Sequence, residues 1–157
     1  MHLELNRQSG ILLHITSLPG PHGIGDLGLG ANSFVDSMKE MGQHLWQILP
    51  TNPPESLYHS PYSASSAFAG NTLLISLEAL QKDGFLEDRD LADFPQSVKD
   101  RVEFDKVDPD RRALLQKAAD RFPKKAPTGM LAEFNDFCIQ NQNWLDHYAM
   151  YCHLAEK

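Results

Sequence analysis

"GILLHITSLPGPHGIGDLGLGANSFVDSMKEMGQHLWQILP", residues 10–50, decides the fold. It begins with GILLHI at residues 10–15, a short and mostly apolar run that predicts a strand buried on both faces, as in a parallel sheet. A loop dense in glycine and proline follows at residues 16–30. The stretch ends with HLWQILP at residues 44–50, which predicts a second buried strand, stopped by Pro50.

A helix is expected between the two strands. Apolar side chains recur there at three- and four-residue steps, and charged residues occupy other positions, which is typical of an amphipathic helix. These apolar residues are Phe34, Val35, Met38 and Met41. Gly42 follows the last of them and suits a left-handed C-terminal cap. A strand–loop–helix–strand unit of this length predicts a right-handed crossover between parallel strands.

The glycine-rich loop contains GIGDLG at residues 23–28, which has the G-x-G-x-x-G spacing of a dinucleotide-binding loop. Three features of the surrounding sequence argue against dinucleotide binding. Residues 17–22 separate the glycines from the strand, and the helix is expected to begin after Gly30 rather than at Gly28. Residues 50–52, Pro-Thr-Asn, stand where an acidic residue would bind a ribose. We therefore favour a loop whose missing side chains let another chain or a ligand come close.

Residues 51–71 lack periodicity and are rich in Pro, Ser, Tyr and small residues. Long loops in compact domains are usually functional, so we expect a functional loop here. Residues 72–80 are predicted to form a short strand that runs into a helical turn. Beyond them the sequence becomes more acidic, and the apolar spacing of residues 111–122 predicts a helix.

Residues 130–157 predict one long helix or two. The polar residues 140–143 are the expected break, with Asn143 as the cap of the second helix. Cys138 and Cys152 lie in this stretch. Their separation matches no zinc or redox motif, and two thiols do not make a disulfide framework. We expect both to be small buried hydrophobic residues.

The composition is that of an ordinary globular domain. The 157 residues carry a formal net charge of −7, with 14 basic and 21 acidic side chains. This balance argues against nucleic-acid binding, which needs clustered Lys and Arg, and against a basic membrane patch. No apolar run is long enough to span a bilayer, and the N-terminal MHLELNRQSG lacks the features of a signal peptide. We expect a cytoplasmic protein and, since no histidine has the spacing of a metal ligand, no metal and no cofactor.

Four motifs make the chain similar to a known family. They are SGILLHITSLPGPHGIGDLG at residues 9–28, WQILP at 46–50, SPYSASSAFAGNTLLI at 60–75 and WLDHYAMYCHL at 144–154. Together they resemble the N-terminal part of the 4-α-glucanotransferases, the amylomaltase or disproportionating-enzyme family of glycoside hydrolases. The resemblance extends from about Arg7 to His153, and the first three motifs are long, ordered and correctly spaced.

The resemblance implies an α/β fold, namely the N-terminal part of a (β/α)8 TIM barrel with a helical insertion. Residues 1–82 would supply the first strands, the crossover helix and a glucan-contact loop, and residues 83–157 a helical insertion subdomain. A complete barrel takes about 250 residues, so the 157 residues are too few for it. The remainder of the barrel, in a longer chain, is therefore an expected partner.

The resemblance also implies the reaction. Family members transfer α-1,4-glucan chains between maltooligosaccharides by a retaining mechanism. A carboxylate nucleophile and a carboxylic acid about 5 Å apart form and resolve a covalent glycosyl-enzyme. The family's catalytic carboxylates lie on later strands, so no catalytic residue is assigned in this chain, which alone is expected to be inactive. An alternative is a truncated or split-gene module that binds glucan without catalysis.

The expected ligand is a maltooligosaccharide or an α-glucan, and the SPY motif supplies the best candidate contacts. Pro61 fixes the backbone next to Ser60, and Tyr62 offers a flat face and a hydroxyl to a sugar. By resemblance, Tyr62 would lie beside the glucose ring at the cleavage point. Asn71 belongs to the same matched motif and also suits a turn or cap. His14, at the end of the first strand, either lines the pocket or is a core histidine.

Five further residues carry expectations but are not assigned to the sugar contact. Asp26 is expected to accept local backbone N–H bonds in a turn rather than to act as an acid. Trp46 is expected either to pack inside the barrel or to contact the ligand. We expect Phe68 in the core and His59 on the surface. Tyr58 is the nearest counterpart of a family tyrosine in the loop before the SPY motif, displaced by about one position.

Overall fold

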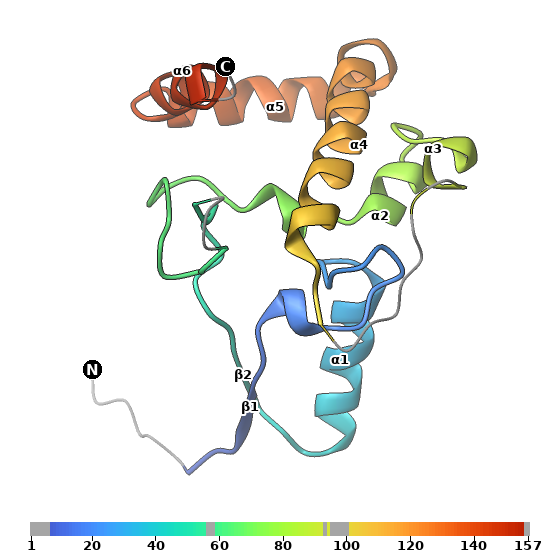
Figure 1. The fold of residues 1–157 in the computed structure, drawn as a ribbon, viewed down its shortest axis with the longest axis vertical. Coiled ribbons are helices and arrows are strands. Elements are labelled where there is room, and N and C mark those ends of the chain that lie inside the picture. Colours follow the sequence, from blue (N-terminus) through green and yellow to red (C-terminus); the bar gives the residue numbers. More distant parts are fainter. Residues whose placement is uncertain (1–6, 56–58, 93, 95–100, 156–157) are drawn as a thin grey trace.

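The computed structural model describes residues 7–55, 59–92, 94 and 101–155. Its first part is the predicted crossover unit, in which strand β1 (Gly10–Leu12), helix α1 (Leu29–Glu40) and strand β2 (Leu45–Gln47) follow one another (Figure 1). The two strands pair in parallel, with Ile11 opposite Trp46. The prediction of two parallel strands joined by a helix is therefore confirmed.

The C-terminal end of α1 depends on Gly42. This residue has a positive φ of 68°, and its N–H donates to the Lys39 carbonyl at 3.1 Å. The Gln43 N–H donates to the Met38 carbonyl at 2.9 Å. These two bonds make a Schellman motif, in which a left-handed residue satisfies the last carbonyls of the helix. The predicted cap at Gly42 is confirmed.

The N-terminal end of α1 corrects one expectation. The helix begins at Leu29 with Gly28 as its N-cap, and not after Gly30. A Cβ atom on Gly28 would lie 2.5 Å from Ser76 Oγ, so only glycine allows this close approach. The dinucleotide hypothesis still fails, because residues 13–22 separate β1 from the first glycine of the motif.

The strands are shorter and more exposed than predicted. Each has three residues, and Leu12 and Leu45 are more than half exposed, so the expectation of strands buried on both faces is wrong. The reason is that two strands with one crossover helix have no second layer to cover their other face. The Trp46 ring packs on Phe34 at a centroid distance of 4.9 Å, and its indole donates to the Leu13 carbonyl at 2.7 Å.

The long loop after β2 is irregular in its described residues, as predicted, but the segment that follows it is not a strand. In place of the strand predicted at residues 72–80, a 3₁₀ turn, η2 (Thr72–Leu74), leads into helix α2 (Leu77–Lys82). Two polar side chains explain the difference. Asn71 and Ser76 each accept a backbone N–H at the start of a helical turn. Such caps satisfy donors that a helix start leaves unpaired, and so favour helix over strand.

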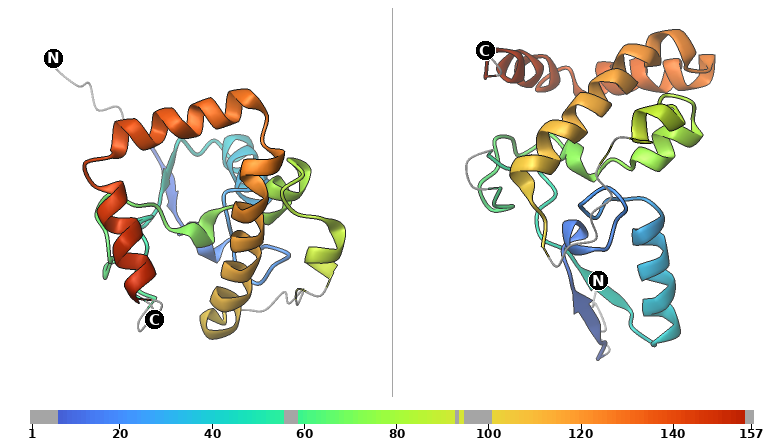
Figure 2. Two further views of the ribbon diagram at one scale, coloured as in Figure 1. Left: turned by 90° about the horizontal axis from the view of Figure 1, so that it is seen from above. Right: turned by 45° about the vertical axis from the view of Figure 1, so that its right-hand side comes forward.

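After α2 the described elements are all helices. They are α3 (Asp88–Ala92), α4 (Phe104–Lys125), α5 (Thr128–Asn141) and α6 (Leu145–Ala155). In the left view of Figure 2, α5 joins α4 to α6, and α4 lies between α6 on one side and α2 and α3 on the other. The break before α6 confirms the two-helix alternative. Asn141 stabilises this break, because its side chain donates to the Phe137 carbonyl and accepts from the Trp144 indole.

The cysteines are less buried than expected. Cys138 on α5 and Cys152 on α6 both have free thiols, and both are only half-buried. Neither of the helices that carry them has a buried residue in the described chain. The prediction of free rather than paired thiols is confirmed, and the prediction of full burial is wrong.

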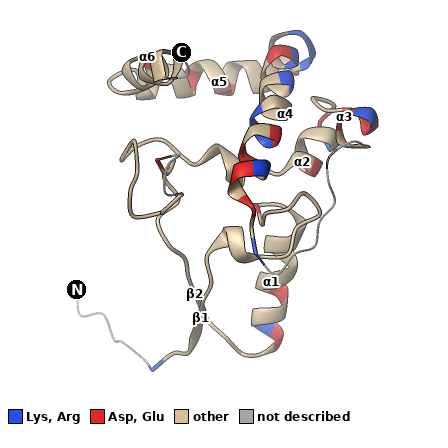
Figure 3. Cartoon of the chain, viewed as in Figure 1, with Lys and Arg blue, Asp and Glu red and all other residues tan. Residues whose placement is uncertain are grey.

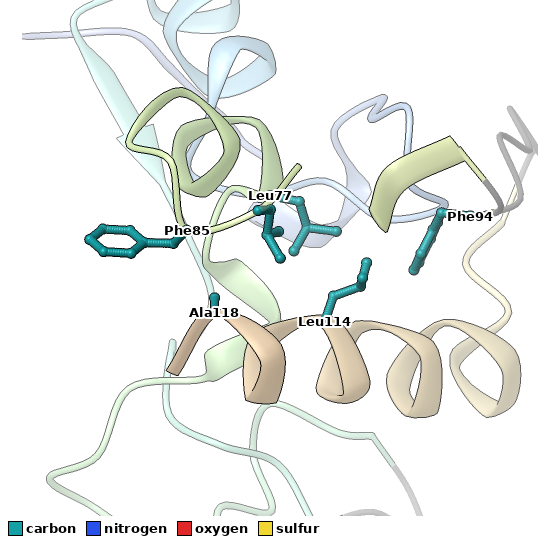
Figure 4. Close-up of a cluster of buried hydrophobic side chains, with 6 residues drawn as sticks. Leu77, Phe85, Phe94, Leu114 and Ala118 are labelled. Carbon is teal, nitrogen blue, oxygen red and sulfur yellow. The ribbon is translucent and has the colours of Figure 1, made fainter. Parts of the chain in front are cut away.

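Helix α4 builds the largest apolar cluster of the described chain. The cluster consists of Leu77, Phe85, Leu86, Phe94, Leu114 and Ala118, most of which are labelled in Figure 4. Two smaller clusters involve the loop after β1. They consist of Ile15, Leu18, Ala31 and Leu74, and of Ile24, Leu73 and Val107. The core therefore lies between α4, α2 and the loops that follow the strands, rather than on the two-stranded sheet.

Ion pairs connect α3 to α4. Arg121 Nη1 donates to Asp90 Oδ2 and, at 3.0 Å, to the Phe85 carbonyl, and Lys117 Nζ lies 3.5 Å from Asp90 Oδ1. The hydrogen bond from Arg121 is the main cause that lowers the pKa of Asp90 to about 2. Asp90 is therefore ionised wherever the pH exceeds this value.

The fully buried Leu77 should dominate the stability of the α2–α4 cluster. We expect Leu77→Ala to lower the free energy of unfolding by about 3 kcal/mol, because the truncation removes apolar contacts and leaves a cavity. Urea denaturation followed by circular dichroism measures this change. The matched control is Leu154→Ala, at an exposed position on α6, which should change stability by about 0.5 kcal/mol or less. Equal effects of the two variants would contradict the assigned core.

The Asp90 contacts predict a loss of stability in acid. Because the pKa of Asp90 is lowered in the folded chain from 3.8 to about 2, its contribution is complete above pH 3.8 and is lost as the pH falls through 2. We expect Asp90→Asn, which cannot ionise, to show a smaller fall in thermal midpoint between pH 4 and pH 2 than the wild type. Identical slopes for the two proteins would exclude this role for Asp90.

Candidate functional site

A cavity of about 200 Å³ lies where the carboxyl ends of β1 and β2 meet. Because parallel strands end at the same edge of a sheet, the loops that follow them come together there. The first loop contributes His14, Thr16 and Ser17, the second Leu49, Pro50, Asn52, Pro54, His59, Pro61 and Asn71, and α4 contributes Phe104. This edge is the place at which α/β folds bind ligands.

His14 lines the cavity from the end of β1, as one of its two expected roles required. Burial lowers the pKa of His14, so its imidazole is neutral at pH 7 and has one donor and one acceptor nitrogen. Its Nδ1 has no hydrogen-bond partner among the described residues. This nitrogen is itself buried, so its hydrogen-bonding capacity is unused in the described structure.

The opposite wall is held by hydrogen bonds within the long loop. The Asn52 side chain donates to the Ala69 carbonyl at 3.1 Å, and the Asn71 N–H donates to the Thr51 carbonyl at 2.8 Å. These bonds join the two ends of the loop. An irregular loop can be well defined when its own backbone groups are paired in this way.

The SPY turn lies beside the cavity. Pro61 lines the cavity, and the Ser60 hydroxyl accepts the Tyr62 N–H at 3.3 Å. Tyr62 is 75% exposed and is not among the lining residues. The structure therefore brings Pro61, His14 and Asn71 to one cavity and places Ser60 and Tyr62 at its rim. Asn71 is also the cap of η2, as its alternative role predicted.

His59 corrects a prediction and anchors the loop to α4. Its side chain is 15% exposed rather than on the surface, because its ring stacks on Phe104 at a centroid distance of 4.7 Å. Its Nε2 lies 3.8 Å from Asp105 Oδ1. Local sequence gives no signal for this contact, since Phe104 belongs to a helix far along the chain. Tyr58, the neighbouring residue, lies outside the described residues.

Phe68 is the second correction. It was expected in the core, but it is 71% exposed and stacks on Trp144, with ring centroids 5.9 Å apart. The reason is that the loop at this point faces α6 and not the strands. A wider cleft of about 660 Å³ lies between this loop, α4 and α6, and is lined in part by Tyr148 and Tyr151.

The cavity is uncharged. No Asp, Glu, Lys or Arg is among the described residues that line it, and Figure 3 shows charge on α1, α3 and α4 but very little on the loop after β2. The lining combines hydroxyl, amide and imidazole groups with proline rings and one aromatic ring. This mixture suits a neutral ligand with many hydroxyl groups, which needs hydrogen bonds and apolar faces rather than charge.

Within residues 7–55, 59–92, 94 and 101–155, no group of three or more His, Cys, Asp or Glu side chains could hold a metal ion. No helix in these ranges is long and apolar enough to cross a bilayer.

The family model for 4-alpha-glucanotransferases, glycoside hydrolase family 77, matches residues 13–157. The chain belongs to the 4-alpha-glucanotransferase family. The resemblance of the four sequence motifs is thereby confirmed, and it covers nearly the whole chain.

Individual relatives of the chain are 4-alpha-glucanotransferases as well. The chain is 43% identical over 152 residues to the 4-alpha-glucanotransferase of Streptococcus pneumoniae and 41% identical over 152 residues to that of Aquifex aeolicus, in each case over 96% of its length. It covers 29% and 30% of those two proteins. The chloroplastic/amyloplastic enzyme of rice is 44% identical over 151 residues, which are 92% of this chain and 25% of the rice protein.

A solved structure extends the likeness to the fold. The amylomaltase from Streptococcus agalactiae in complex with acarbose superposes with a TM-score of 0.85 at 36% identity. The match covers 96% of this chain and 30% of that amylomaltase. The chain therefore has a mixed α/β fold that corresponds to part of an amylomaltase.

Asp26 stabilises the loop after β1 and its contact with α4. Its Oδ1 accepts the Gly28 N–H at 3.0 Å, as the turn interpretation predicted. Its Oδ2 pairs with Arg111 Nη2 at 3.1 Å, a contact that the sequence did not suggest. Asp26 is not among the residues that line the cavity. Both oxygens are thus engaged in holding the backbone and α4.

The cap role of Asn71 can be tested by stability alone. We expect Asn71→Ala to lower the free energy of unfolding by about 1 kcal/mol, because the Leu73 N–H loses its acceptor. Asn71→Asp keeps an oxygen at this position and should retain most of that stability. Thermal unfolding measures both variants. If the two lose stability equally, the cap assignment is wrong.

Proposed function

We propose that this chain is the N-terminal portion of a 4-alpha-glucanotransferase built on a (β/α)8 barrel. Residues 1–82 form the first two strands, their crossover helix and the glucan-contact loop, and residues 83–157 form a helical insertion. The exposure of Leu12, Leu45 and Ile48 supports this proposal, because neighbouring strands and helices of a barrel would cover them. The remainder of the barrel is the partner that the fold requires.

The proposed role of the chain is to hold glucan and not to cleave it. The family reaction transfers an α-1,4-glucan through a covalent glycosyl-enzyme and needs two carboxyl groups about 5 Å apart. None of the described residues that line the cavity is an Asp or a Glu. The observation that carries the proposal is the uncharged cavity at the carboxyl ends of β1 and β2, with Tyr62 at its rim.

Each candidate residue has a distinct proposed contact. Tyr62 lies flat against a glucose ring, because the C–H face of a sugar packs on an aromatic ring and its hydroxyl reaches an edge of the sugar. Ser60 and Pro61 hold the turn that presents it. Neutral His14 and the Asn71 side chain exchange hydrogen bonds with sugar hydroxyls. The bound molecule is a maltooligosaccharide or the end of an α-glucan.

A second candidate function is a glucan-binding module without catalysis. The carboxylate-free lining of the described cavity favours it, because the same contacts would serve binding alone. The two functions differ in what completes the site. In the first, carboxylates from the rest of a barrel stand opposite this cavity. In the second, nothing further is needed for binding. The cytoplasm is the proposed compartment in both cases.

Maltoheptaose binding to the purified chain tests the proposed contact. We expect Tyr62→Ala to weaken binding about tenfold, the equivalent of about 1.4 kcal/mol, because the ring platform is lost. Isothermal titration calorimetry measures the dissociation constant. Phe137→Ala, which truncates an exposed aromatic residue on α5 away from the cavity, is the matched control and should bind as the wild type does. Equal affinity of Tyr62→Ala and the wild type removes Tyr62 from the site.

The absence of cleavage by the isolated chain is tested with maltotriose. We expect no glucose release over the rate without protein, because the described cavity presents no carboxyl group. An enzymatic glucose assay gives this rate. Measurable release would mean that the chain itself contains the catalytic carboxylates.

A further inference from the structure

The N-terminal half of α4 packs across the two loops that line the cavity. One side of α4 contacts the loop after β1, at Ile24 and Asp26. The same side contacts the segment that ends the loop after β2, at Leu73 and Ile75. Two residues of α4 make these contacts, and they lie one helical turn apart. Val107 meets the first residue of each loop pair, and Arg111 meets the second.

The first of these two contacts is apolar. Val107 packs with Ile24 of one loop and Leu73 of the other, and all three are buried. The second contact is polar. Arg111 Nη2 donates to Asp26 Oδ2 at 3.1 Å and also to the Ile75 carbonyl.

Arg111 is the largest fully buried side chain of the described chain, with an exposed fraction of 0%. Its Nε and Nη1 have no hydrogen-bond partner among the described residues, so a single nitrogen, Nη2, makes both links. A buried guanidinium held in this way is sensitive to the positions of both partners, because an unpaired buried charge is strongly unfavourable.

The two loops also touch each other beside this residue. The Leu27 N–H donates to the Leu74 carbonyl at 2.9 Å. Leu27 follows Asp26, and Leu74 precedes Ile75, so this bond lies immediately next to both contacts of Arg111. The exchange of the Leu27 amide proton therefore reports on the separation of the loops.

Both contacts connect to the cavity through single hydrogen bonds. The Gly25 N–H, next to Asp26, donates to the carbonyl of Thr16, which lines the cavity. The Leu74 N–H donates to the carbonyl of Asn71, another lining residue. Phe104, one turn before Val107, lines the cavity itself.

We infer that Arg111 is a positioning residue, which sets the width of the candidate glucan cavity by holding the loop after β1 and the loop after β2 at a fixed separation. It touches no ligand and acts through Asp26 and Ile75. The helical insertion thereby shapes the binding site that the strands provide. Only the sugar-binding part of this inference rests on the proposed function.

The test is amide hydrogen exchange of the 157-residue chain, followed by NMR. We expect Arg111→Met to speed exchange of the Leu27 amide at least tenfold relative to the Leu80 amide, which is bonded to Ser76 within α2. A uniform loss of stability would speed both amides alike. The matched control is Arg112→Met. Arg112 is the neighbouring arginine of α4 and pairs with Asp108 of its own helix, so this variant should leave the Leu27 amide protected.

Two conservative variants complete the set. Arg111→Lys keeps one cationic nitrogen and should restore part of the Leu27 protection that Arg111→Met loses. Asp26→Asn keeps an oxygen acceptor for Gly28 while it removes the negative charge, so it tests the same link if Arg111→Met does not fold. Unchanged Leu27 exchange in the folded variants overturns the inference, and so does faster exchange in Arg112→Met.

Maltoheptaose titration of the same proteins separates the two proposals. We expect the dissociation constant of Arg111→Met to rise about tenfold, with Arg112→Met equal to the wild type. Faster Leu27 exchange with unchanged affinity overturns the role of Arg111 in the sugar site. If the wild type binds no maltoheptaose, the proposed function fails, and the exchange of the Leu27 amide alone decides whether Arg111 holds the loops.

Discussion

The burial of one face of α4 is the interaction on which the described structure depends. Val107, Arg111, Leu114 and Ala118 recur at steps of four, three and four residues, which places them on one side of a helix, and all four are buried. The first two meet the loops that follow the strands, and the last two meet α2 and the segment after it. The sheet contributes only six residues, so the helix and not the strands provides the surface on which the loops are ordered.

Local pattern predicted the crossover unit because each of its signals acts over a few residues. The apolar runs, the helical spacing and Gly42 all lie within residues 10–50, and the structure has the predicted order of elements and the cap at Gly42. Burial was predicted less well, because Val35 and Met41 of the expected apolar helix face are exposed. The prediction of a strand at residues 72–80 was wrong because a short apolar run does not distinguish strand from helix. The cap residues Asn71 and Ser76 were visible in the sequence and carried the correct signal.

Long-range contacts explain what the sequence did not reveal about the site. Arg111 lies 85 residues from Asp26 in the chain, and the stack of His59 on Phe104 joins a loop to a distant helix. Neither pair has a local pattern. Three residues that the family motifs singled out, His14, Pro61 and Asn71, come from different parts of the chain and line one cavity. The exposure of Phe68 was missed because hydrophobicity alone does not show which side of a loop faces solvent.

The lack of charge around the cavity has a consequence for the conditions under which the site works. Binding that relies on ion pairs weakens as dissolved salt screens the charges. The described lining has hydroxyl, amide, imidazole and ring groups in place of ion-pairing side chains, so the binding of a neutral ligand there would have no such electrostatic component. If the proposed sugar binds here, shape and hydrogen bonding would set its affinity, and we expect that affinity to change little with ionic strength.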